Sequence, residues 1–185
     1  MKKTSCGILG ALALLAAAQP ARAQGTPISI DARVGAVLPF GDWGNLARTG
    51  TEVRGGVTFH ASSIIGIYGG YGWARYDTES GLGDGHWTEQ GFNAGVNARI
   101  VPRDGGSLVP FFRAGVIVHQ LSATDAGGTV KGDHKVGVEV GTGVEFQVRP
   151  RITVMPTVGY SQFDPGVANF DVTNIHLGVG ASFRI

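Results

Sequence analysis

The chain has 185 residues, a length that suggests a single domain, and 31 of them are glycine, more than twice the average usage of roughly 7%. The glycines follow no three-residue period, which excludes a collagen-like chain, and they disfavour long helices. The formal net charge is only +1, so there is no basic excess of the kind that attracts nucleic acid, and we expect no nucleic-acid partner.

The first 23 residues have the three parts of a secretory signal peptide. Lys2 and Lys3 give a positive start, residues 8–18 form an apolar run, and Ala21-Arg22-Ala23 is a small-x-small cleavage site. We therefore expect a cleaved signal peptide at 1–23 and one folded domain at 24–185. Removal of the signal peptide takes away three of the 15 basic residues, which leaves 12 basic against 14 acidic residues and a net charge near −2. It also removes Cys6, the only cysteine, so no disulfide is expected.

After the signal peptide, apolar and other residues alternate with a period of two through eight successive segments. The first segment, 28–38, places Ile30 and Val34 on one face and Asp31 and Arg33 on the other. The later segments repeat the pattern at 51–61, 64–76, 87–100, 108–121, 134–148, 151–163 and 172–185. The segments are 11 to 15 residues long, which covers the ~9–11 residues that a tilted strand needs to span a membrane. The sequence therefore predicts an all-β, eight-stranded antiparallel up-and-down transmembrane barrel.

The connections between these segments alternate in length, which predicts short turns at one end of the barrel and longer loops at the other. The long connections are 39–50, 77–86, 122–133 and 164–171, and the shorter ones are 62–63, 101–107 and 149–150. In the first long loop, Trp43 is interpreted as an exposed aromatic residue. It either contacts lipopolysaccharide or a partner, or has no function.

Two kinds of barrel fit the alternation: a membrane barrel with its apolar face on lipid, and a soluble exported barrel with that face around a ligand. Fourteen glycines share the polar face, which favours a narrow interior and therefore the membrane barrel. Charges of both signs lie on the same face and suit ion pairs in a lumen. The predicted lumen charge network is Arg33, Glu52, Arg54, Arg113, Glu139 and Glu145.

Aromatic residues on the apolar face predict two girdles, as expected where a barrel crosses both membrane interfaces. One girdle lies toward the short turns and the other toward the long loops. Their members are Phe59, Phe112, Phe146 and Phe183 in the first, and Tyr71, Trp73, Phe92 and Tyr160 in the second.

The chain ends in Gly180-Ala-Ser-Phe183-Arg-Ile185. Together with the signal peptide and the eight alternating segments, this end resembles the small outer-membrane β-barrel family, the OmpA/OmpX-like eight-stranded proteins. The resemblance implies that Gly180, Phe183 and Ile185 form the terminal signal read by the barrel-assembly machinery. It also implies an integral protein of the bacterial outer membrane, in contact with outer-membrane lipid and lipopolysaccharide, with both termini on the periplasmic side. We expect a monomer.

Candidate groups for catalysis and metal binding are few. In the triplet His60-Ala61-Ser62, which ends the second segment near the short turns, Ser62 is interpreted as a turn residue. His119, with Ser122 nearby and Glu139 across a neighbouring strand, is the best nucleophile–base arrangement, and we interpret it as a lumen histidine in a polar network. The histidines show no ligand spacing. We expect no enzyme activity, no bound metal and no cofactor.

Eight strands leave an interior just wide enough for side chains, so we expect a filled lumen without a wide pore. The predicted function is a structural or surface-interaction role in the outer membrane. Two alternatives stay open: an outer-membrane channel for small solutes or hydrophobic compounds, and a soluble exported ligand-binding barrel.

Overall fold

The structure, a computed structural model, describes residues 28–79, 85–102, 106–166 and 170–185. The expected signal peptide therefore lies outside the described residues. The elements are β1 (Ile28–Phe40), η1 (Gly41–Asn45), β2 (Gly50–His60), β3 (Ile65–Asp77), β4 (Gly85–Arg99), β5 (Leu108–Asp125), β6 (Gly128–Arg149), β7 (Ile152–Phe163) and β8 (Val172–Arg184). The described residues contain no helix that is long and apolar enough to cross a membrane.

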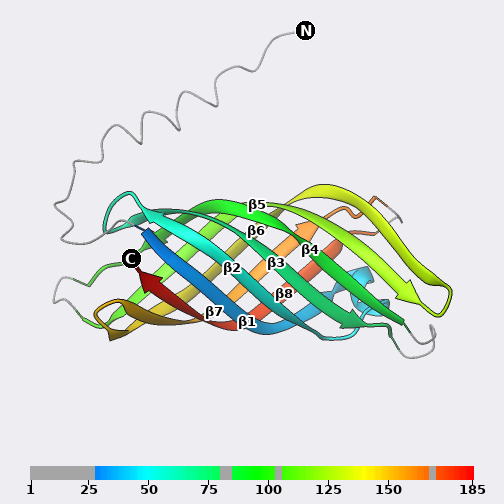
Figure 1. Ribbon diagram of the computed structural model, residues 1–185, viewed down its shortest axis with the longest axis horizontal. Helices are drawn as coiled ribbons and strands as arrows, with labels where there is room; N and C mark the ends of the chain where they lie inside the picture. Colours follow the sequence, from blue (N-terminus) through cyan, green and yellow to red (C-terminus); the bar gives the residue numbers. More distant parts are fainter. Residues whose placement is uncertain (1–27, 80–84, 103–105, 167–169) are drawn as a thin grey trace, which may run out of the picture.

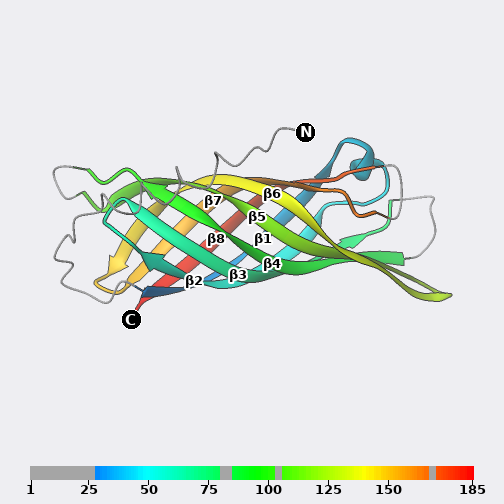
Figure 2. The same cartoon turned by 90° about the horizontal axis from the view of Figure 1, so that it is seen from above.

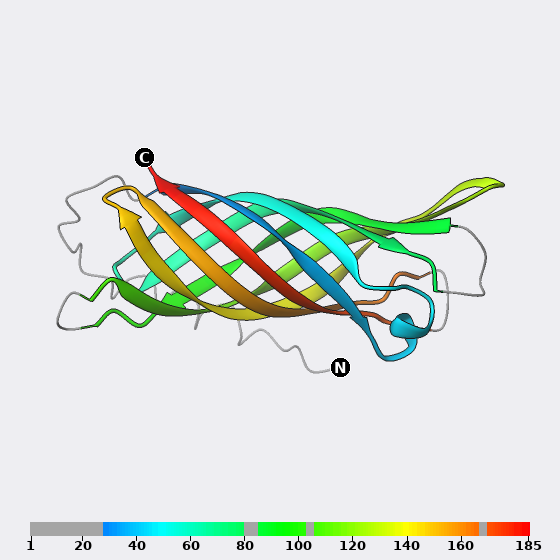
Figure 3. The ribbon, with the colours of Figure 1, turned by 90° about the horizontal axis from the view of Figure 1, so that it is seen from below.

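Each strand pairs in antiparallel fashion with the next, and β8 pairs with β1, so the sheet is a closed barrel (Figure 1). Closure leaves neither β1 nor β8 with a free edge, as a lipid-exposed sheet requires. The beginning of β1 and the end of β8 lie together at one end, here called the terminal end (Figure 3). The opposite end, which carries η1, is called the loop end. The eight-stranded barrel predicted from the alternation is confirmed.

The apolar residues of the alternating pattern lie on the outside of the barrel. Phe92 is 63% exposed and Phe112 is 56% exposed, and the valines and isoleucines of the same face are exposed as well. The interior holds buried polar and charged side chains instead. This is the arrangement of a membrane barrel and the reverse of a soluble ligand barrel, whose apolar face lines the interior.

The prediction of a loop at 122–133 is wrong, because these residues are mostly strand. β5 continues to Asp125 and β6 begins at Gly128, so the two strands form a hairpin that projects from the loop end (Figure 2). The carboxylate of Asp125 accepts a hydrogen bond of 2.7 Å from the Gly127 amide, and Gly128 turns the chain with a φ of 132°. The projecting strands are held by pairing with each other rather than by an apolar face, so period-two alternation does not reveal them.

Trp43 is the second correction, since its side chain is fully buried rather than exposed. The helix η1 folds inward at the loop end (Figure 3) and places the indole against Tyr76, Trp87 and Phe170, at centroid distances of 5.5, 5.3 and 5.8 Å. The indole Nε1 donates a hydrogen bond of 3.1 Å to Asn174 Oδ1 on β8. We call Trp43, Tyr76, Trp87 and Phe170 the aromatic plug. It fills the lumen at the loop end.

Adjacent glycines of β3 show why the interior needs small residues. A Cβ on Gly70, which faces the lumen, would lie 2.5 Å from the Gly55 carbonyl oxygen and 3.1 Å from Asn93 Oδ1. A Cβ on Gly69, which faces outward, would meet nothing closer than 3.9 Å. Gly70→Ala is therefore expected to lower the free energy of unfolding by about 1–3 kcal/mol, as overpacking does. Urea unfolding in lipid vesicles checks this value, with Gly69→Ala as the matched control. Equal effects of the two substitutions would contradict it.

Candidate functional site in the lumen

Glu139 on β6 is the centre of a buried network in the middle of the lumen. Its carboxylate accepts hydrogen bonds from Arg54 Nη1 at 2.9 Å and Arg113 Nη2 at 2.8 Å. The Tyr68 hydroxyl donates at 2.7 Å and the Asn93 amide at 3.1 Å. These donors come from four other strands, so the side chains cross the lumen and tie its opposite walls together. A buried carboxylate needs such pairing to offset its lost hydration.

Glu52 extends the network on the β1–β8 side. One carboxylate oxygen accepts a hydrogen bond from Arg54 Nε at 2.8 Å and lies 2.8 Å from His176 Nδ1. The other ring nitrogen of His176 lies 2.8 Å from the Ser161 hydroxyl. Arg54 therefore joins the two carboxylates into a continuous barrier of ion pairs across the lumen. We call this group the central network: Glu52, Arg54, Tyr68, Asn93, Arg113, Glu139, Ser161 and His176.

A third carboxylate, Glu89, lies between the central network and the aromatic plug. It accepts hydrogen bonds from the Tyr76 hydroxyl at 2.5 Å and from the Asn174 amide at 2.9 Å, and it lies 2.6 Å from His119 Nδ1. The partner of His119 is thus Glu89, and the suggested approach of Glu139 is wrong, because Glu139 stands opposite Gly115 in the β5–β6 register. Sequence reasoning did not include Glu89 in the network, although it lies on the polar face of β4.

Three interior arginines lie along glycines of neighbouring strands. A Cβ added to Gly72 would lie 3.2 Å from the Arg54 side chain. A Cβ on Gly141 would lie 3.2 Å from the Arg113 side chain, and one on Gly178 would lie 3.3 Å from the Arg33 side chain. The guanidinium of Arg113 also lies 4.0 Å from the centroid of the Tyr68 ring. The polar-face glycines thus make the room that long side chains need in a narrow barrel.

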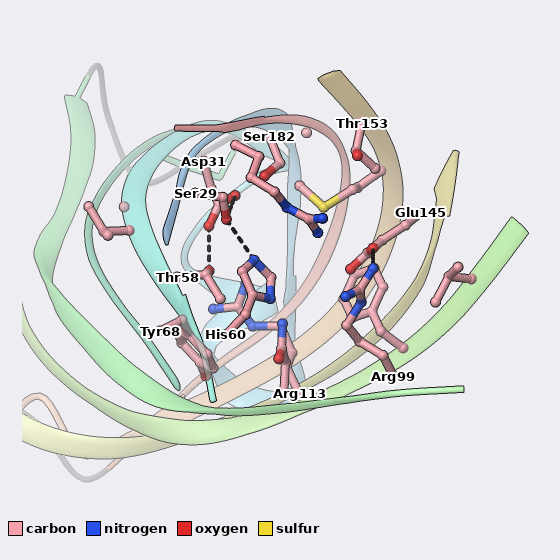
Figure 4. Close-up of a pocket in the computed structure, with 18 of the residues that line it drawn as sticks. Ser29, Asp31, Thr58, His60, Tyr68, Arg99, Arg113, Glu145, Thr153 and Ser182 are labelled. Atoms are coloured by element: carbon pink, nitrogen blue, oxygen red, sulfur yellow. Dashed lines mark hydrogen bonds and ion pairs between the residues drawn. The ribbon is translucent and has the colours of Figure 1, made fainter. Parts of the chain in front are cut away.

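Toward the terminal end the lumen opens into a cavity of about 730 Å³ (Figure 4). Figure 4 shows Ser29, Asp31, Thr58 and His60 on one side of this cavity and the Arg99–Glu145 pair on another, joined at 2.6 Å. The cavity is lined in part by the turns at 61–64 and 150–151, so it reaches the mouth of the barrel. The expected filled lumen therefore describes the loop half and the middle of the barrel, and not the terminal end.

The six predicted network residues do not form one cluster. Glu52, Arg54, Arg113 and Glu139 meet in the central network, whereas Glu145 pairs with Arg99 near the mouth. Arg33 stands apart, since its Nε is 3.9 Å from Glu52 Oε1 and makes no hydrogen bond. Arg99 was missed as a partner of Glu145, although its place on the polar face near a strand end could have suggested it.

The predicted girdle residues lie on the outside of the barrel. All are exposed except Tyr160, which is half-buried, and the Tyr71 and Phe92 rings pack edge to face at 5.2 Å. Among the assembly-signal residues, Gly180 pairs with Arg33 of β1 and Phe183 with Ile30. Ile185, just after β8, donates its amide to the Ile28 carbonyl. Their roles in lipid contact and in assembly stay predictions.

Ser161, His176 and Glu52 of the central network lie in the order of a nucleophile, a base and an acid, with 2.8 Å at each step, but Ser161 is fully buried, so its hydroxyl is out of reach of a substrate. A second serine–histidine contact faces the cavity at the terminal end. The Ser29 hydroxyl lies 3.1 Å from His60 Nε2, but Asp31 bonds to Ser29 and Thr58, and His60 Nδ1 has no partner. The histidine thus lacks the carboxylate that would orient it. His60, the last residue of β2, lines this cavity, and Ser62 lies in the following turn, as expected, where its hydroxyl accepts hydrogen bonds from the Ile64 and Ile65 amides at 3.2 and 3.0 Å. The described residues hold no group of three or more metal ligands.

Residues 8–183 match the family described as the outer membrane protein beta-barrel domain. Among solved structures, Neisserial surface protein A (NspA) superposes with a TM-score of 0.67 at 15% identity, over 86% of this chain and 97% of that one. OprG from Pseudomonas aeruginosa superposes with a TM-score of 0.56 at 12% identity, over 87% of this chain and 98% of that one. Ail of Yersinia pestis, in complex with a heparin analogue, superposes with a TM-score of 0.52 at 19% identity, over 84% of this chain and 96% of that one. No curated protein matches the sequence.

Proposed function

Because the chain belongs to the outer membrane protein β-barrel family, we propose that it serves as a structural or surface-interaction protein of the bacterial outer membrane whose lumen conducts no solute. The observation that carries the proposal is the pair of barriers across the lumen. The central network closes the middle with ion pairs, and the aromatic plug closes the loop end. A continuous water-filled path through the lumen would require both barriers to open.

The apolar outer surface supports an integral location. We propose that the predicted girdles contact the two membrane interfaces and that lipid and lipopolysaccharide surround the barrel as a monomer. The terminal end then faces the periplasm, and the β5–β6 hairpin projects outside the cell. The Gly180–Ile185 end is proposed to address the chain to the barrel-assembly machinery.

The hairpin and the loop end are the surfaces available to an outside partner. The hairpin carries strand residues beyond the barrel, including Val130 and Lys131, that are exposed. Ail, whose name describes an attachment invasion locus protein, shares the barrel fold, which supports a surface role for such a scaffold. A partner would thus be bound by the projecting backbone and side chains and not through the lumen.

Planar-bilayer recording tests the closed lumen. Purified barrel inserted into a lipid bilayer is expected to give no resolved single-channel current, because the ion-paired middle excludes a hydrated ion. Folded insertion is checked in parallel by a shift in SDS gel mobility on boiling. Steady unitary currents from heat-modifiable protein would contradict the proposal and favour the channel for small solutes or hydrophobic compounds.

A further inference from the structure

We propose that the cavity at the terminal end binds a small organic anion, a carboxylate or phosphate with a short apolar body, and that Arg33 holds its charged group. The inference concerns the open half of the lumen. It depends on the barrel fold, and it does not depend on whether the closed half conducts ions.

Arg33 is an interior cation that has no hydrogen-bonded carboxylate among the described residues. It stands opposite Arg54 in the β1–β2 register, and like charges in this relation repel. Arg54 is satisfied by Glu52 at 2.8 Å and Glu139 at 2.9 Å. Arg33, whose side chain is 14% exposed, has only Glu52 at 3.9 Å, beyond hydrogen-bond distance. The neighbouring arginine thus takes the carboxylate that Arg33 would need.

A buried hydrogen-bond donor of Arg33 is also unpaired. A guanidinium has five N–H donors, and the buried Nε–H of Arg33 has no acceptor among the described residues. Leaving buried donors unpaired is costly. An oxyanion beside Arg33 would supply acceptors for two parallel hydrogen bonds, the geometry in which guanidinium binds carboxylate and phosphate.

The charges that line the cavity favour an anion. The lining arginines are Arg33, Arg54, Arg99, Arg113, Arg151 and Arg184, and the lining carboxylates are Asp31 and Glu145. Arg99 already holds Glu145, and Asp31 accepts hydrogen bonds from Thr58 and Ser29. The added charge of Glu52 and Glu139 behind the wall still leaves arginines in excess. The cavity therefore presents a positive potential.

The apolar part of the ligand is suggested by the side chains beside Arg33. The Met155 Cε and the Arg33 Cβ lie 3.3 and 3.6 Å from the same Cβ position of Gly180, so the two side chains are neighbours. Val109 and Phe111 line the same cavity. Its volume of about 730 Å³ is within the ~300–1,000 Å³ typical of small-molecule sites. A short aliphatic chain next to the charged group would contact this wall.

Titration of detergent-solubilised barrel with butyrate, inorganic phosphate and 1-butanol, at constant ionic strength, tests the proposal. The readout is the NMR signal of each arginine Nε–H group. Butyrate and phosphate are expected to shift the Arg33 signal saturably, whereas neutral butanol should not. Tighter binding of butyrate than phosphate assigns the ligand to apolar carboxylates, and the reverse order assigns it to phosphates.

Arg33→Gln is expected to weaken the binding of both anions at least tenfold. Arg149→Gln, which removes the same charge from an exposed site outside the cavity, should leave binding unchanged. Equal binding by wild type and Arg33→Gln, or equal effects of butyrate and butanol, would overturn the proposal. If Arg33→Gln does not fold, an Arg33 signal that ignores both anions in the wild-type protein overturns it as well.

Discussion

Glu139→Ala is expected to lower the free energy of unfolding by about 3–5 kcal/mol, the usual cost of removing one partner from a buried ion pair. The substitution leaves Arg113 without its carboxylate and Arg54 with Glu52 alone. It also removes the acceptor of the Tyr68 and Asn93 hydrogen bonds. Urea unfolding of the barrel in lipid vesicles measures the change.

Asp133→Ala is the matched control for this prediction. Asp133 lies on the same strand but is exposed, so its removal should leave the stability nearly unchanged. A loss of less than about 1 kcal/mol for Glu139→Ala would contradict the ion-paired barrier, since it would mean that water already satisfies the two arginines. The double variant Glu139→Ala, Arg113→Ala should recover part of the loss if their pairing is its cause.

Trp43→Ala is the second large expected effect, with a loss of about 3–5 kcal/mol for truncating a fully buried indole. Its removal leaves a void between Tyr76, Trp87 and Phe170 and deprives Asn174 Oδ1 of its donor. The same unfolding measurement checks this loss. Phe40→Ala, an aromatic truncation on the exposed outer face three residues earlier, is expected to cost much less.

Conductance of Trp43→Ala separates the two barriers. Removal of the plug opens the loop end but leaves the central network in place, so the variant is expected to stay non-conducting. Unitary currents in Trp43→Ala but not in wild type would contradict the assignment of the central network as a barrier. The plug alone would then close the lumen.

The fold could be predicted because strand alternation is a local property. The outward position of Val34 and the inward position of Arg33 follow from their places in the sequence, and the closed barrel follows from eight such segments. The hairpin at 122–133 was missed because its residues do not continue the alternation of apolar and polar side chains. Trp43 was misplaced because a loop residue has no alternating neighbours that show whether it turns inward.

The partners inside the lumen could not be predicted from the same pattern. Alternation assigns Glu139 and Arg54 to the interior, but it does not give their heights along the barrel axis or their positions around it. These depend on the stagger of the strands and on the closure of β8 on β1. The meeting of Glu139 with Arg54 across the lumen, and the isolation of Arg33, therefore emerge only when the barrel is closed.

The most direct test of an integral barrel with a lipid-facing apolar surface is spin labelling of single cysteines in lipid vesicles. The one cysteine, Cys6, lies in the expected signal peptide, so labels can be placed singly on residues 24–185. A label at Val116, 52% exposed in the middle of β5, should be reached by oxygen and protected from a water-soluble nickel complex. A label at Val130, 71% exposed on the projecting hairpin, should be reached by the nickel complex. Equal access of the nickel complex to both labels would contradict the membrane-spanning barrel.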